Sequence, residues 1–146
     1  MASVDREVVR GRIERLLHEV DAIAERTPPE YEAYAAPDAE ALRYELEHRL
    51  LIALQAVIDI STHVAVVSGV RPLDTYRDCV MAMRALDVVP SELGERLAPA
   101  VGLRNVLVHE YQAVDGRFVH AALADAGTLR AFAAAVWRWI ERGGGR

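Results

Sequence analysis

The segment from about Asp38 to Val67 constrains the fold more than any other part of the chain. After Leu50 its apolar residues point in every direction of a helical wheel, so as a helix it must be buried on several sides. A helix of this length rises about 45 Å, at about 1.5 Å per residue. Gly69 and the Arg71-Pro72 turn are expected to end it. The rest of the chain is therefore expected to wrap around one long central helix.

The flanking segments supply helices of the expected kind. Residues 4–26 repeat apolar side chains at three- to four-residue spacing, with Ser3 as a candidate N-cap. Shorter helices are predicted over residues 75–86, 118–123 and 128–141. The sequence therefore predicts an all-α fold, an up-and-down bundle of five to six helices.

Pro99 is expected to kink or break the helix that starts near Ser91, close to Ala98, because proline lacks the N–H that an internal helical position donates. A new helix would begin at Pro99, where proline is favoured in the first turn. The helical part of the chain reads as a single domain over residues 1–142. The Gly-rich residues 143–146 are predicted to be a disordered tail.

Charge and cysteine content narrow the function. The formal net charge is −5, which argues against a generally basic coat for nucleic acid, so any RNA contact must come from a local cationic cleft. The single cysteine, Cys79, excludes an intrachain disulfide and a cysteine cluster for zinc. No apolar run reaches about 18 residues without interruption. We therefore expect a cytoplasmic protein with no membrane partner.

A polar seam crosses the central segment. Gln55, Asp59 and His63 follow one another at four-residue steps and share one face of a helix, with His48 and Thr62 nearby. Buried polar groups need partners. The seam is either a water-exposed edge or structural network, or it places Asp59 against a second helix that carries chemistry.

That second helix is the segment Gly102–Tyr111. At about 100° per residue, Arg104, Asn105, His109 and Tyr111 gather on one side, between roughly −20° and 140°. Leu103, Val106 and Leu107 fall on the opposite side, between roughly 200° and 300°. One face is apolar and the other carries an arginine, an amide, a histidine and a phenol.

These residue types suit the chemistry of a phosphodiester. Histidine titrates near neutrality and can move a proton to or from a ribose hydroxyl. Arginine presents a planar fork of donors to phosphate oxygens. Asn105 lies one turn before His109 and can orient the ring or the substrate. Such a reaction requires no metal and no other cofactor.

The string Arg104-Asn105-x3-His109-x-Tyr111 resembles the R-N-x3-H-x-Y motif of HEPN-domain ribonucleases of the HepT-like toxin family. The resemblance covers the chain from the first predicted helix to about Trp139, and the motif is its only specific part. It implies a homodimeric helical bundle whose two motifs meet at the interface and cleave RNA without metal. It further implies that Arg104 and His109 are catalytic, and that a minimal nucleotidyltransferase antitoxin adenylylates Tyr111. A tRNA substrate and products with a cyclic phosphate and a 5′-hydroxyl are the family's expectation.

Two other hypotheses are consistent with the sequence. In the first, the chain is a non-catalytic helical subunit that presents Tyr111 to a nucleotidyltransferase or recruits its substrate, because positioning and catalysis need the same face of the helix. Alternatively it is a helical dimer with no site, since an isolated arginine–histidine pair on a helix is most often a solvated pair.

Overall fold

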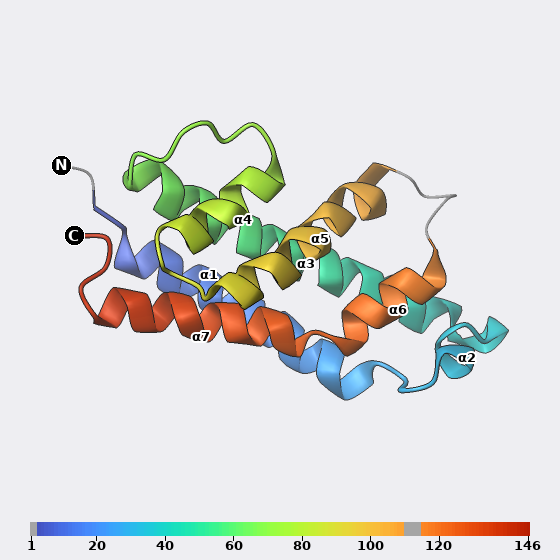
Figure 1. The fold of residues 1–146 in the computed structure, drawn as a ribbon. Coiled ribbons are helices and arrows are strands. Elements are labelled where there is room, and N and C mark those ends of the chain that lie inside the picture. The colour runs from blue at the N-terminus through green and yellow to red at the C-terminus, as the bar shows by residue number, and fades with distance from the viewer. Residues whose placement is uncertain (1–2, 110–114) are drawn as a thin grey trace.

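The computed structural model describes residues 3–109 and 115–146, and in this part of the chain every regular element is helical (Figure 1). The elements are α1 (Arg6–Arg26), α2 (Tyr31–Tyr34), η1 (Pro37–Ala39), α3 (Glu40–Val67), α4 (Tyr76–Ala85), α5 (Ser91–His109), α6 (Gly116–Ala124) and α7 (Gly127–Glu141). The all-α prediction is confirmed. The described residues hold seven α-helices rather than five to six, because the expected linker before Pro37 contains the single-turn helix α2.

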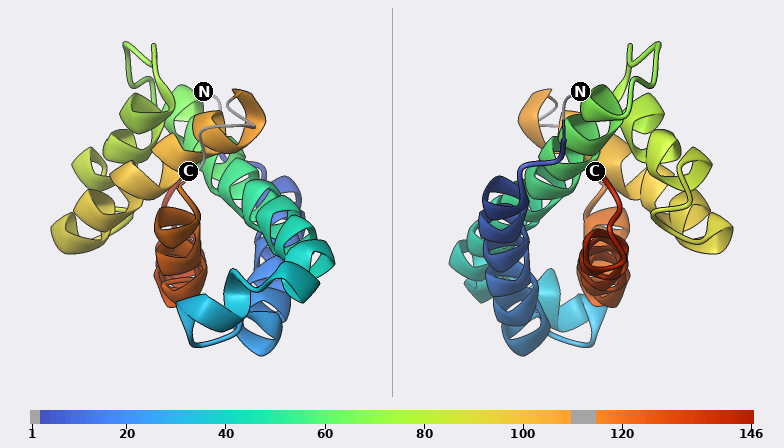
Figure 2. Two further views of the ribbon diagram at one scale, coloured as in Figure 1. Left: turned by 90° about the vertical axis from the view of Figure 1, so that its right-hand side faces the viewer. Right: turned by 90° about the vertical axis from the view of Figure 1, so that its left-hand side faces the viewer.

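Helix α3 is the central element and packs against α1, α4 and α5. Figure 2 shows α4 and α5 on one side of the bundle and α1 on the other. Its buried side chains cover several faces: Leu46, Leu50, Ala53, Leu54, Ala56, Val57, Ile58, Ile60, Ser61, Val64 and Ala65. The prediction of a helix enclosed by its neighbours is therefore confirmed.

By length and composition, the stretch Pro37–Val67 is the one helix in the described part of the chain that could span a bilayer. Of its most apolar window, 56% is buried inside the protein. Core helices of bundles have the same apolar composition, because they too lack an exposed face.

An ion-pair network fastens α3 to α1 on the side away from α5. Glu19 of α1 is buried, and its carboxylate lies 2.9 Å from Arg49 Nη1 and 3.4 Å from Arg15 Nε. Arg49 also reaches Glu45 at 3.5 Å. A buried carboxylate needs such partners, so the network fixes how α1 and α3 lie against each other.

Helix α5 runs without interruption from Ser91 to His109, so the predicted break at Pro99 is wrong. Pro99 is exposed, whereas its neighbours Leu97, Ala98 and Val101 are buried. The carbonyl of Glu95, which loses its N–H partner at position 99, therefore sits on the side that faces water. Burial of the opposite face outweighs the missing hydrogen bond.

The two chain ends lie together at one end of the bundle (Figure 1). The N–H of Val4 donates to the carbonyl of Gly145 at 2.9 Å, and the N–H of Gly144 donates to Trp139 at 2.9 Å. These two hydrogen bonds join residues 144 and 145 to Trp139 and Val4. Gly143 and Gly145 have φ of 86° and 80°, which lets the chain turn back onto Trp139. The N-cap of α1 is Asp5 rather than Ser3, since the Asp5 carboxylate accepts from the N–H groups of Glu7 and Val8.

Candidate active site

The last turns of α5 present the polar and apolar faces that the sequence predicts. Leu103 is buried, and Val106 and Leu107 pack against the core. Arg104 is half-buried, whereas Asn105 and His109 are exposed. Tyr111 lies outside the described residues, so its position relative to this face remains a prediction.

Arg104 is held by residues of two other helices. Its Nε donates to Oε1 of Gln55 on α3 at 3.0 Å. Its guanidinium carbon lies 5.1 Å from the ring centroid of Tyr76, the first residue of α4. A longer contact of 3.4 Å joins Nη1 to Oδ1 of the neighbouring Asn105. Three helices thus converge on one guanidinium.

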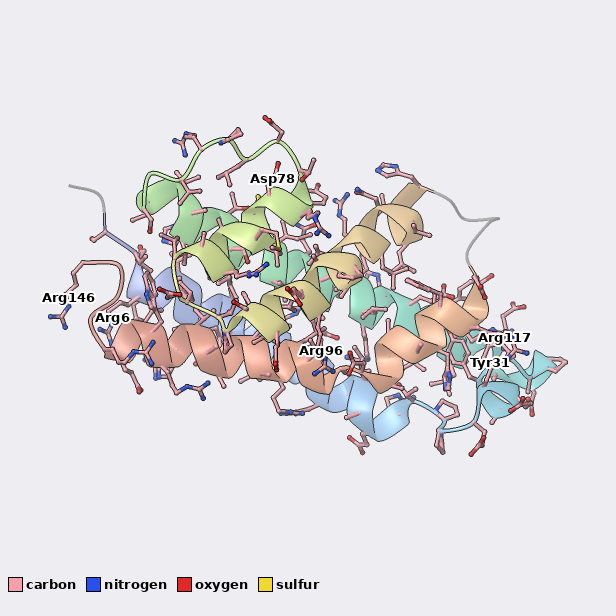
Figure 3. All side chains as sticks on the ribbon, viewed as in Figure 1. Arg6, Tyr31, Asp78, Arg96, Arg117 and Arg146 are labelled. Atoms are coloured by element: carbon pink, nitrogen blue, oxygen red, sulfur yellow. The ribbon has the colours of Figure 1, made fainter. Side chains whose placement is uncertain are left out.

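Local sequence determines where Tyr76 stands. Thr75 and Asp78 form a capping box, in which each side chain accepts a hydrogen bond from the other residue's backbone N–H. Figure 3 shows Asp78 at the start of α4.

Further along, Gly94 of α5 lies so close to α4 that an added Cβ would meet Cβ of Arg84 at 3.1 Å. A small residue is required there for α4 and α5 to pack closely.

The polar side chains of the α3 seam make contacts in two separate places. Asp59 accepts from Nε2 of Gln55 at 2.9 Å, so it lies beside the residue that bonds Arg104. It makes no direct hydrogen bond to Arg104 or His109 among the described residues. His63 instead accepts from the N–H of Asp5 at 3.0 Å, and Thr62 donates to the carbonyl of Ile58 within α3. His48 is exposed. Asp59 therefore faces the motif helix through Gln55, while the rest of the seam is structural or solvated.

Sequence reasoning missed the roles of Gln55 and Tyr76. Gln55 was placed on the correct face by its four-residue spacing to Asp59, but nothing local pairs it with Arg104, which is 49 residues away. The signal for Tyr76 was an aromatic residue directly after the helix cap Thr75, which fixes its position but names no partner.

A second aromatic cluster lies at the opposite end of the bundle from the termini. Tyr31 and Arg117 meet there in Figure 3, with the guanidinium carbon 4.3 Å from the ring centroid. His120 donates from Nε2 to the carbonyl of Pro28 at 2.7 Å and packs on Tyr34, with ring centroids 5.1 Å apart. Burial, with Glu47 nearby, raises the pKa of Tyr34 to about 12. These contacts join α2 to α6 and give His120 a structural role.

A hollow of 480 Å³ lies between α1 and α7, lined by Ile13, Leu17 and Trp137 among others, and Arg104, Asn105 and His109 do not line it. Within residues 3–109 and 115–146, no group of three His, Cys, Asp or Glu side chains could hold a metal ion. The chemistry that the described motif residues can offer is proton transfer by His109 and stabilisation of negative charge by Arg104.

Comparisons with known proteins agree with this geometry. Residues 3–136 match the family described as Ribonuclease HepT-like. The chain is 30% identical over 119 residues to a candidate RNase of Archaeoglobus fulgidus, covering 81% of this chain and 86% of that protein. It is 32% identical over 80 residues to the tRNA nuclease HepT of Aphanizomenon flos-aquae, covering 53% of each.

Solved structures share the fold at low sequence identity. The cytosolic protein YutE of Bacillus subtilis superposes with a TM-score of 0.84 at 16% identity, covering 100% of this chain and 97% of YutE. The tri-AMPylated HEPN toxin of Shewanella oneidensis, solved in complex with its MNT antitoxin, superposes with a TM-score of 0.78 at 18% identity. That match covers 92% of this chain and 99% of the toxin.

Proposed function

Since the chain belongs to the HepT-like ribonuclease family, we propose that it is a metal-independent endoribonuclease and the toxin of a toxin–antitoxin pair. One observation carries the proposal. An anchored guanidinium and an exposed imidazole lie five residues apart on one uninterrupted helix, α5. Their Cα atoms are separated by about 7.5 Å along its axis.

In the proposed reaction, neutral His109 takes the proton of a ribose 2′-hydroxyl. The 2′-oxygen bonds to the adjacent phosphorus while the bond from phosphorus to the 5′-oxygen breaks, which leaves a 2′,3′-cyclic phosphate. A protonated imidazole gives its proton to the departing 5′-oxygen. Arg104 binds the phosphate oxygens and stabilises the charge that grows on them. Asn105 and Asp59 orient the groups around the scissile bond, Asp59 through Gln55.

The protein is proposed to act as a homodimer whose α5 helices approach each other. One copy offers the half-buried Arg104 and the exposed His109 on the polar face of α5. Two copies would supply a base and an acid at once, and would concentrate positive charge in a chain whose net charge is −5. A light-scattering mass of one chain at micromolar concentration would contradict this arrangement.

The proposed partner is a minimal nucleotidyltransferase antitoxin that adenylylates Tyr111. The AMPylated toxin of Shewanella oneidensis with its MNT antitoxin supports this assignment. On a continued α5, Tyr111 would lie about 20° from Arg104 around the helix, so an attached AMP would bring a second phosphate to the same cation. Toxin and antitoxin are expected to act in the cytoplasm, where their RNA substrates are.

The test is cleavage of a tRNA pool and of a defined RNA by the purified protein in the presence of EDTA. We expect products with a 2′,3′-cyclic phosphate and a 5′-hydroxyl, and no cutting of a strand with a 2′-deoxy residue at the scissile position. Arg104→Ala and His109→Ala should each lose roughly 10²- to 10⁴-fold in rate, the usual contribution of such groups. His109 is exposed, so His109→Ala should hardly change the melting temperature. Arg104→Ala also removes the hydrogen bond to Gln55 and should cost about 1 kcal/mol of stability.

Other outcomes separate the alternatives. Strict dependence on added metal would refute the proposed chemistry. No cleavage of any RNA by the wild type, together with adenylylation of Tyr111 by a co-expressed minimal nucleotidyltransferase, would identify a non-catalytic partner subunit. Peptide mapping that places AMP on Tyr31, Tyr34, Tyr44 or Tyr76 instead would remove Tyr111 from the regulation.

A further inference from the structure

The direction of the Gln55 amide is fixed by its two neighbours. A carboxylate such as Asp59 only accepts hydrogen bonds, and a guanidinium such as Arg104 only donates them. Only an amide with its NH2 toward Asp59 and its oxygen toward Arg104 satisfies both, as observed at 2.9 Å and 3.0 Å. Asp59, Gln55 and Arg104 therefore form a directed chain of hydrogen bonds that runs from α3 to α5.

This chain determines which edge of the guanidinium remains for a ligand. The bond to Gln55 occupies Nε, the nitrogen closest to the helix. The terminal nitrogens make, among described residues, only the 3.4 Å contact from Nη1 to Asn105. The two terminal nitrogens form a planar fork that matches two oxygens of a phosphate. With Nε held, that fork points away from α3.

Tyr76 restrains the same group from another side. Its ring lies at cation–π distance from the guanidinium, 5.1 Å from centroid to carbon. The ring is half-buried and packs against the core, and the capping box at Thr75 and Asp78 fixes its backbone. Movement of the guanidinium is therefore opposed both by the hydrogen bond from Nε to Gln55 and by the adjacent Tyr76 ring.

We propose that Gln55 and Tyr76 are positioning residues, which hold Arg104 with its terminal nitrogens aimed at the scissile phosphate, and that Asp59 sets the direction of Gln55. The inference rests on the proposed function. It assigns Asp59 an indirect role and adds two residues to the site. The competing explanation is that the same contacts only fasten α3 and α4 to α5.

Kinetics of purified Gln55→Ala, Tyr76→Ala and Tyr76→Phe separate the two explanations. Loss of a hydrogen bond to a charged group corresponds to about 10- to 100-fold, so Gln55→Ala should lose that factor in kcat with KM changed less than about threefold. Tyr76→Ala should lose roughly threefold to tenfold, and Tyr76→Phe, which keeps the ring, should stay within about twofold of wild type.

Gln55→Glu is the sharpest single variant. It keeps the size and the acceptor but faces Asp59 with a second carboxylate, and it pairs the guanidinium with an anion that competes with phosphate. We expect a larger loss than for Gln55→Ala. The matched control is His48→Ala, an exposed residue two turns earlier on α3, which should leave both kinetic constants unchanged.

A double-mutant cycle with Arg104→Lys tests whether Gln55 acts through Arg104. Lysine lacks the planar fork, so in that background Gln55→Ala should cost less than about twofold further. An equal loss in both backgrounds, or a wild-type kcat for Gln55→Ala with Arg104→Ala inactive, would overturn the inference. A rate loss that follows a fall in melting temperature would show a fastening role and would also overturn it. Cleavage by Arg104→Ala at the wild-type rate would instead refute the proposed function.

Discussion

In the buried Glu19–Arg49 ion pair, removing the arginine is predicted to lower the free energy of unfolding more than removing the carboxylate. Glu19 has a side chain that is 4% exposed, whereas that of Arg49 is 27% exposed and has a second partner in Glu45. Arg49→Met keeps the packing of the stem but leaves the carboxylate with Arg15, whose side chain is 60% exposed. Breaking a buried pair from one side typically costs about 3–5 kcal/mol, and the remaining Arg15 places this variant near 3 kcal/mol.

Removing the other charge should cost less. Glu19→Gln keeps an oxygen that accepts from Arg49, and the arginine retains both Glu45 and access to water. We expect about 1 kcal/mol for this variant. The double variant Glu19→Leu/Arg49→Met replaces the pair by apolar side chains, and should lie within about 1 kcal/mol of wild type. The double variant is therefore predicted to be more stable than Arg49→Met alone.

Urea and thermal unfolding at pH 7, followed by circular dichroism, measure these differences. For a chain of this size, about 3 kcal/mol corresponds to a shift in melting temperature of about 10 °C. The control is Glu14→Gln on the same helix, whose ion pair with Arg10 is 3.4 Å long with side chains 70% and 58% exposed. It should cost less than about 0.5 kcal/mol. A larger loss for Glu19→Gln than for Arg49→Met, or a double variant less stable than Arg49→Met alone, would refute the reasoning.

Three further predictions concern single residues. Pro99→Ala should raise the free energy of unfolding by about 1–2 kcal/mol, because it restores a helical N–H at an exposed position without removing packing; a loss in urea unfolding would contradict the account of α5. Tyr34→Phe should be neutral or stabilising by about 1 kcal/mol in thermal melts at pH 7, since the Tyr34 hydroxyl is buried without a partner among the described residues. The folded pKa of Tyr34 is about 12, above its unfolded value, so the stability that this shift contributes is complete below pH 10 and is lost as pH rises toward 12. The free energy of unfolding should therefore fall less steeply at alkaline pH for Tyr34→Phe than for the wild type, and an identical fall would exclude Tyr34 as its source.

The local elements of this fold could be predicted from the sequence, because their signals are local. The three- to four-residue apolar spacing in α1 and the all-round apolar content of α3 correspond to observed burial. The break at Pro99 could not be judged in the same way. Whether a proline interrupts a helix depends on whether the freed carbonyl meets water, and that depends on tertiary packing.

For the candidate site, the sequence predicted the face of α5 that carries the motif but not the residues of other helices that contact it. The helical wheel placed Arg104 and His109 on the outward face of α5, as the structure has them. Their environment comes from α3 and α4, and contacts such as that of Gln55 with Arg104 join residues 49 positions apart. One of the two alternatives for the seam placed Asp59 against the motif helix, and in the structure Gln55 lies between Asp59 and Arg104. Sequence spacing identifies a face of a helix and does not identify which side chain across the interface will reach it.

The exposed proline in α5 also has a consequence for local opening. Residue 99 has no amide hydrogen, so the ladder of backbone hydrogen bonds lacks one rung between the half that packs beside α7 and the half that bears Arg104 and His109. Backbone hydrogen bonds of a helix break in cooperative units, and we expect the boundary between two units at the position of the missing hydrogen bond. Amide hydrogens at residues 103–109 can thus exchange with solvent through openings that leave residues 95–98 protected. The free energy of those openings is set by the burial of Leu103 and by the packing of Val106 and Leu107 on the core, together with the hydrogen bond from Arg104 to Gln55.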